Sequence, residues 1–213
     1  MLTVCFTPKG GAGGSVVAAA LALQVAASGQ PCLLVDLAGD LAAVLGVAED
    51  DGVGDWMAAA DDVPIDALRA LETPVVDNLR LLRYGNAEPA DWSEDRRQLA
   101  ISVFAARATA VIVDAGTGPR WWPEQVTTIA VVRSCYLGVR RLTAAVRPAD
   151  HVVVVEEAGR VLRRRDIEEA IGRPALAIPW DPAVARAVDA GLLAHRLPRS
   201  LRGLRPLLDR GVA

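Results

Sequence analysis

The chain has 213 residues, and 52% of them are hydrophobic, which is enough to bury a good core in one domain spanning residues 1–213. Lys and Arg number 23 against 26 Asp and Glu, so the net charge of −3 excludes a global basic field that would draw the protein onto nucleic acid. The three cysteines, Cys5, Cys32 and Cys135, are widely spaced among apolar residues, which favours reduced, buried thiols in a cytoplasm over a disulfide framework or a zinc site.

Strand-like and helix-like patterns alternate along the chain. The short apolar runs that predict strands are Leu2–Phe6, Pro31–Leu37, Leu79–Tyr84, Ala110–Ala115, Thr128–Arg133, His151–Val155 and Ala175–Pro179. The longer patterns predict helices at Ser15–Ser28, Asp91–Arg107, Leu137–Val146, Arg163–Ile171 and Pro182–Leu193. Such alternation is typical of βαβ units, so we predict an α/β fold with a mostly parallel, twisted sheet of seven or eight strands flanked by helices.

Three segments allow more than one interpretation. The apolar run after Lys9 loosely mimics a signal peptide, but the glycine cluster between them favours strand, loop and helix. The stretch SLRGLRPLLDRGV places Leu201, Leu204 and Leu208 on one helical face, which fits either a helix that closes the core or one that binds a membrane surface or a partner. The segment Gly46–Asp55, rich in glycine and carboxylates, is predicted to be mobile and to build little core.

Residues 7–15 read TPKGGAGGS between a predicted strand and a predicted helix. In that setting a glycine-rich turn aims backbone N–H groups and the helix dipole at one anion. Against the phosphate-loop pattern GxxxxGK[ST], Gly13 and Ser15 are in register, but Gly14 replaces the lysine. The hydroxyl of Ser15 can cap the helix or ligate Mg²⁺. The candidate phosphate-binding residues are Lys9, Gly10, Gly11, Ala12, Gly13, Gly14 and Ser15.

Lys9 is the only lysine in the chain. The stretch KGGAGGS resembles the deviant phosphate loop KGGxGK[ST] of the ParA/MinD family, in which the early lysine reaches across a nucleotide-sandwiched dimer. The resemblance implies a P-loop NTPase fold, ATP or ADP with Mg²⁺ as cofactor, and a homodimer. It also implies that Lys9 contacts the phosphates of the partner subunit in trans.

Further stretches resemble the CpaE/TadZ branch of that family. VDLAGDLAAVLGV is similar to the branch pattern VDLDxxFGDLAxxLGL if about three residues are deleted after Leu37. The deletion falls on the aspartate that orients the attacking water, whereas Asp36 stays at the strand end and Asp40 matches a later aspartate. The tail EEAIGRPALAIPWDPAVARAVDAG and the following LPRSLRGL are also close to the branch pattern.

Two more sites follow from the resemblance. AVIVDAGTG resembles a Walker B strand that ends at Asp114, which implies that Ser15, Asp36 and Asp114 hold Mg²⁺ when nucleotide binds. Where relatives have an Asn-Arg pair whose asparagine reads adenine, this chain has Glu156-Glu157. A carboxylate accepts hydrogen bonds but cannot donate one to a purine acceptor.

These departures predict a degenerate nucleotide site. The missing loop lysine removes a charge-assisted hydrogen bond of about 1.5–3 kcal/mol, which weakens binding roughly 10- to 100-fold. Hydrolysis loses both a cation and the water-positioning carboxylate, so little or no turnover is expected. By resemblance the chain is a cytoplasmic, dimeric factor that positions pilus, secretion or cell-division machinery at a pole or septum. Because Gly14 lessens repulsion across the dimer and Lys9 can pair with Asp40 or Asp114, dimerisation is predicted not to depend strictly on ATP.

Two alternatives stay open. One is a working ATPase in which Lys9 from the partner subunit compensates for Gly14. The other is a ParA-like partition protein that binds DNA non-specifically through arginines, by phosphate contacts that depend on salt concentration. The arginines concerned are Arg140, Arg141, Arg163, Arg164 and Arg165. The run Arg163–Arg165 also suits a solvated helix face.

Overall fold

A computed structural model describes residues 1–59, 64–88, 92–117, 122–145 and 147–208. Eight strands form one sheet in the order β3-β4-β2-β5-β1-β6-β7-β8. Neighbouring strands run parallel except for the antiparallel pair β3 and β4 at one edge. The strands are β1 (Leu2–Phe6), β2 (Cys32–Asp36), β3 (Glu72–Val76), β4 (Leu79–Leu82), β5 (Ala110–Asp114), β6 (Thr127–Arg133), β7 (His151–Glu156) and β8 (Leu176–Pro179). The predicted α/β fold with a mostly parallel sheet is confirmed.

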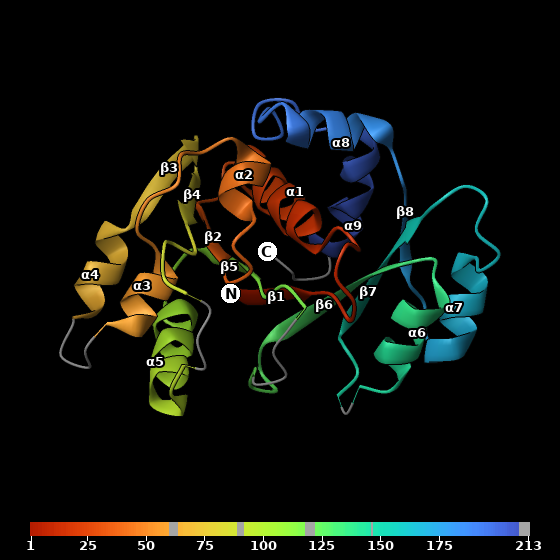
Figure 1. Cartoon of the computed structure of the whole chain (residues 1–213), viewed down its shortest axis with the longest axis horizontal. Coiled ribbons are helices and arrows are strands. Elements are labelled where there is room, and N and C mark those ends of the chain that lie inside the picture. The colour runs from red at the N-terminus through yellow and green to blue at the C-terminus, as the bar shows by residue number, and fades with distance from the viewer. Residues whose placement is uncertain (60–63, 89–91, 118–121, 146, 209–213) are drawn as a thin grey trace.

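Helices cover both faces of the sheet (Figure 1). One face carries α1 (Gly14–Ala27), α2 (Leu41–Leu45), α8 (Pro182–Asp189), the 3₁₀ turn η1 (Arg199–Leu204) and α9 (Arg205–Leu207). The other face carries α3 (Val53–Ala58), α4 (Ile65–Ala70), α5 (Glu94–Ala105), α6 (Tyr136–Thr143) and α7 (Arg164–Ile171). The central strands are mostly apolar rather than alternating, as expected of strands that are covered on both sides.

Helix α1 is central to the site because it starts directly after the glycine-rich loop. Its alanine-rich sequence is almost entirely buried, and small side chains let it pack closely across β1, β2 and β5. The helix ends before Gly29, whose φ of +87° is the left-handed conformation that commonly follows a helix end. The helix predicted at Ser15–Ser28 is therefore confirmed, with each end moved by one residue.

The expectations for the first half of the chain need correction. Strand β3 was not predicted, because Pro74 interrupts its pattern and its position at the sheet edge leaves it only half-buried. The prediction that Gly46–Asp55 builds little core is wrong, since α3 begins at a fully buried Val53. The Asp55 carboxylate accepts the N–H of Gly52 at 2.7 Å and so fixes the start of that helix.

The structure also decides between the two interpretations of the C-terminal stretch, as far as its residues are described. Instead of one amphipathic helix, it forms the η1 turn and a single turn of α9. Leu201 and Leu204 are buried in the cluster under α1, and Leu208 packs partly against it, so the segment closes the core as one of the two interpretations held. Residues 209–213, and the last residue of the helix predicted at Leu137–Val146, lie outside the described part. No helix in the described ranges is long and apolar enough to cross a bilayer.

Candidate nucleotide site

The loop of residues 7–13 connects β1 to α1 at the carboxyl edge of the sheet. Gly11 and Gly13 have φ of +76° and +91°, a left-handed conformation that glycine adopts without strain. The first N–H groups of any helix have no intrahelical partner, and Gly13, the N-cap of α1, supplies no side chain to cap them. This is the strand, loop and helix arrangement that suits a phosphate group.

Ser15 differs from its expected role as a helix cap. It is the second residue of α1, and the cap position belongs to Gly13. Its hydroxyl instead lies beside the carboxylate of Asp114 at the end of β5, where it acts to lower the pKa of that group. The structure thus brings together two of the three residues expected to hold Mg²⁺.

Asp114 is fully buried, and burial raises its pKa, against the opposing effects of the Ser15 hydroxyl and the Gly116 N–H. Its Oδ1 accepts the N–H of Gly116 at 3.0 Å, whereas its buried Oδ2 accepts no hydrogen bond within the described residues. A buried carboxylate oxygen without a donor suits a cation. No cluster of three or more His, Cys, Asp or Glu side chains that could hold a metal occurs in the described ranges. A metal here would therefore need Ser15 and ligand oxygens besides Asp114.

Asp36, the third expected ligand, lies level with Asp114 on the neighbouring strand β2. Its Oδ1 accepts N–H groups from Ala38 at 2.9 Å and Gly39 at 2.7 Å, and its Oδ2 accepts that of Leu41 at 2.8 Å. These bonds brace the turn into α2. Burial raises the pKa of Asp36 to about 6, although the three N–H donors oppose that shift.

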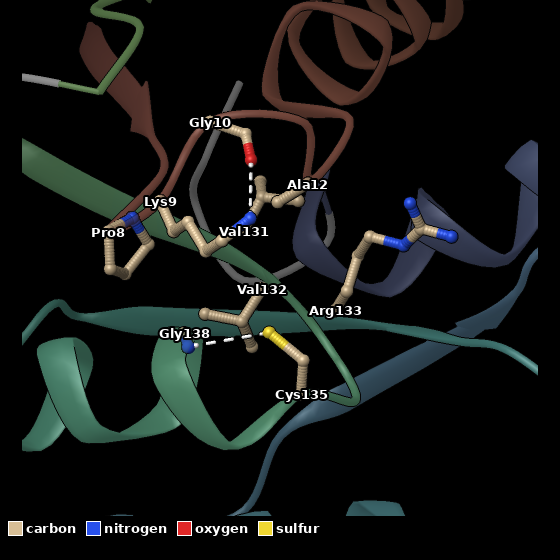
Figure 2. A pocket seen from close by; sticks show the side chains of 9 residues that line it. All are labelled: Pro8, Lys9, Gly10, Ala12, Val131, Val132, Arg133, Cys135 and Gly138. Atoms are coloured by element: carbon tan, nitrogen blue, oxygen red, sulfur yellow. Dashed lines mark hydrogen bonds between the residues drawn. The ribbon is translucent and has the colours of Figure 1, made fainter. Parts of the chain in front are cut away.

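Lys9 is exposed, and its Nζ lies 3.4 Å from the carbonyl oxygen of Gly10 (Figure 2). The expected pairing with Asp40 or Asp114 is not formed within the chain, since no ion pair of Lys9 occurs among the described residues. Pairing across a dimer stays a prediction.

At the position of the absent loop lysine, Gly14 is buried beneath the side chain of Thr7. A Cβ atom at Gly14 would lie only 2.6 Å from Cγ2 of Thr7. The loop in this conformation therefore has no room for any side chain at position 14.

A cavity of about 290 Å³ extends from the loop to the end of β8. Its walls are mostly apolar and come from α1, the ends of β7 and β8, and α8. They include Gly11, Val16, Val155, Ile178, Pro179, Trp180 and Val184. Trp180 lines this cavity and is 47% exposed. A mostly apolar cavity beside such a loop has the character of a ligand pocket.

Arg133, at the end of β6, lines this cavity and was not identified from the sequence. Its guanidinium forms a 2.8 Å ion pair with Glu157 and lies 3.5 Å from the carbonyl oxygen of Gly11. Glu157 also pairs with Arg160 at 2.8 Å, and the two arginines hold the pKa of its carboxyl below the ordinary value. Glu157, which by resemblance stands in place of an arginine, thus holds Arg133 beside the loop. Figure 2 shows Arg133 extending from the strand end on the same side as the loop.

The position of Arg133 follows from the strand order, which the local sequence patterns do not reveal. Strand β6 pairs with β1, so the residue that ends β6 must lie next to the loop that follows β1. A second arginine reaches the loop from α6, where Arg141 lies 3.5 Å from the carbonyl oxygen of Pro8. The arginines Arg140, Arg163, Arg164 and Arg165 are exposed on α6 and around the start of α7, and Arg164 pairs with Glu168.

The cysteines take no part in this site as metal ligands or disulfides. Cys5 and Cys32 are buried, and burial raises the pKa of the Cys32 thiol to about 12. Cys135 is only half-buried, which corrects the expectation for that residue, and its Sγ accepts the N–H of Gly138 at the start of α6 (Figure 2).

Comparison with known proteins identifies the fold. No protein-family model and no curated protein sequence matches the chain. Among solved structures, a ParA family ATPase from Chlorobium tepidum TLS aligns with a TM-score of 0.71 and 21% identity, over 99% of this chain and 94% of that one. A chain of the MinC:MinD cell division protein complex from Aquifex aeolicus aligns with a TM-score of 0.75 and 17% identity, over 98% of this chain and 96% of that one.

A third structure, the septum site-determining protein MinD from Pyrococcus horikoshii OT3 complexed with Mg-ADP, aligns with a TM-score of 0.71 and 16% identity, over 98% of this chain and 96% of that one. At these identities the similarity shows the fold alone. The chain thus has the P-loop NTPase fold seen in ParA and MinD proteins.

Proposed function

We propose that this chain is a degenerate ParA/MinD-like protein of the CpaE/TadZ type, with one domain over residues 1–213, that binds ATP or ADP weakly or not at all and hydrolyses little or none. The observation that carries the proposal is the state of position 14. Gly14 brings no cation to the loop, and the methyl group of Thr7 lies where a side chain at that position would begin.

The remaining parts of the site suit the binding of a magnesium nucleotide better than they suit its hydrolysis. The loop Lys9–Ser15 would hold phosphate oxygens through backbone N–H groups, and Ser15 and Asp114 would face the metal. Asp36 braces its own turn, so it would act through that turn more than as a ligand. A Mg²⁺ ion would neutralise phosphate charge here, whereas by resemblance the deletion after Leu37 removes the aspartate that would position the attacking water.

The biological role that we propose is that of a cytoplasmic, homodimeric factor that positions a pilus, secretion or cell-division assembly at a pole or septum. Support comes from the CpaE/TadZ-like sequence stretches together with the fold that the chain shares with ParA and MinD proteins. One of the aligned proteins was solved in a cell division complex with MinC.

Calorimetry with Mg-ATP and Mg-ADP, combined with a phosphate-release assay, tests the nucleotide part. We expect a dissociation constant of about 10–100 μM or weaker, and phosphate release equal to the background without protein. Lys9→Ala should then leave the release unchanged. Submicromolar binding, or a steady rate of release from the natural protein, would contradict the proposal.

Light scattering with and without Mg-ATP tests the dimer. We expect the same dimer mass in both conditions, because Gly14 removes one of the two cations that repel across the interface in ordinary relatives. A monomer in both conditions, or a dimer only with ATP, would show that the constitutive dimer is wrong.

An active ATPase remains the second candidate, and one observation favours it. Lys9 is exposed and has no ion-pair partner among the described residues, so it is free to reach a phosphate of a second subunit. A steady hydrolysis rate that disappears with Lys9→Ala would select this candidate. For the partition alternative, DNA affinity that falls steeply with salt and drops when Arg163–Arg165 are replaced would be the corresponding result.

A further inference from the structure

We infer that Thr7 is the positioning residue of the phosphate loop, and that it makes the loop specific for glycine at position 14. The two residues form one steric unit. A lysine restored at position 14 alone would therefore not restore the site.

Thr7 ties the loop to the segment that follows β5. Its backbone N–H and its Oγ1 both donate to the carbonyl oxygen of Gly116, at 2.8 and 3.2 Å. The N–H of Gly116 in turn donates to Oδ1 of Asp114 at 3.0 Å. Thr7 is only 5% exposed, so these contacts are shielded from water. Through this chain of hydrogen bonds, the orientation of Thr7 is linked to that of the buried carboxylate.

The same side chain fills the space next to Gly14. With Oγ1 directed to Gly116, Cγ2 lies 2.6 Å from the place of a Cβ atom on Gly14, a distance that non-bonded carbon atoms do not tolerate. A threonine has a branched and stiff χ1, so it can make room only by leaving its rotamer or by turning Oγ1 away from Gly116. Either movement disturbs the contact that holds the turn beside Asp114.

The backbone conformation at position 14 does not require glycine. Unlike Gly11 and Gly13 it has no positive φ, and it is the first residue of α1. An alanine there would otherwise be favoured, because glycine is a poor helix former. The requirement for glycine therefore comes from the Thr7 methyl group, and it should disappear when that methyl group is removed.

Four variants test the steric unit by thermal unfolding: Gly14→Ala, Thr7→Ser, the double variant Thr7→Ser/Gly14→Ala, and the control Gly10→Ala. Serine keeps the hydroxyl that donates to Gly116 and removes only the methyl group. The control lies in the same loop, where a Cβ would meet Cγ2 of Thr117 at an ordinary 3.5 Å. We expect Gly14→Ala to lower Tm by about 4–8 °C and the control by less than about 2 °C.

In the Thr7→Ser background, the same Gly14→Ala change should leave Tm unchanged or raise it. Equal losses of Tm in both backgrounds would overturn the inference. If Gly14→Ala fails to fold, the double variant decides: a folded double variant supports the steric unit, and an unfolded one refutes it.

A second measurement concerns nucleotide binding and rests on the proposed function. Calorimetry with Mg-ATP compares Gly14→Lys with Thr7→Ser/Gly14→Lys, and we expect the double variant to bind at least about 10-fold more tightly. Equal affinities of the two variants would refute the role of Thr7 in the site. Tight binding by the natural protein would instead refute the proposed function, while the Tm comparison would still stand, so the two failures are distinguishable.

Discussion

Replacing Gly46 by alanine should destabilise the protein through one defined contact between α2 and α8. Gly46 is the C-cap of α2, with φ +71° and ψ +31°. A Cβ atom there would lie 2.9 Å from the carbonyl carbon and 3.0 Å from the Cα of Gly191, just after α8. Gly172 provides a matched control, because it caps α7 with nearly the same angles, φ +69° and ψ +22°, and a Cβ there meets nothing within 4 Å.

The two substitutions share the cost of a left-handed alanine, about 1–2 kcal/mol, which the reduced entropy of the unfolded chain offsets in part. Only Gly46→Ala adds overlap with rigid backbone, which costs about 1–3 kcal/mol more. We therefore expect a loss of about 2–4 kcal/mol for Gly46→Ala and about 1 kcal/mol for Gly172→Ala, measured by urea unfolding with an unchanged m-value. Losses that agree within about 0.5 kcal/mol would refute the close approach of α2 and α8.

Further predictions concern charge and capping. Burial raises the pKa of Asp36 from 3.8 to about 6, so the folded protein holds the carboxyl proton more tightly than the unfolded chain does. The free energy of unfolding should therefore fall by roughly 3 kcal/mol as pH rises from about 4 to above 6. Denaturation curves of Asp36→Asn should lack this component, and an identical pH profile would contradict it. Glu157→Gln should release Arg133 and tighten ATP binding about 3- to 10-fold by calorimetry, and the gain should vanish when Arg133→Gln is added. Ser93→Ala removes the N-cap bond of α5 to the N–H of Arg96 and should cost about 1 kcal/mol in urea unfolding.

The parts of the fold that the sequence predicted are those with strong local patterns. Seven strands were recognisable, most of them because strands buried on both faces are continuous apolar runs, as in the VVVV of His151–Glu156. Strand β3 and the short helices α2, α3 and α4 were not recognisable, since five or six residues carry too little periodicity. Val53 illustrates the limit: it is fully buried within a glycine-rich and acidic stretch, because α3 places it under the sheet.

The residues of the candidate site also divide into those that the sequence predicted and those that it did not. The loop and Asp114 follow from motif and position, because both lie where a parallel strand ends. Thr7 contacts Gly116, and Arg133 pairs with Glu157. Both contacts join segments far apart in the chain, and no spacing rule connects them. Asp36 shows a different limit, since its place at the strand end was predicted but its three backbone donors depend on the shape of the turn that follows.

The two departures from an ordinary phosphate loop differ in physical kind, and this bears on what the site retains. Glu157 exchanges one charge for another and leaves a cation, Arg133, at the cavity wall, where a competing anion can draw it away. Gly14 removes a cation, and the Thr7 methyl group occupies the space beside it, a change that no ligand can reverse. Electrostatic losses of the first kind weaken binding by degrees, whereas the second fixes the shape of the loop. On the proposed function, such a protein would keep the loop, the cavity and the carboxyl edge of its sheet as a surface, while the chemistry of phosphate transfer would lose its support.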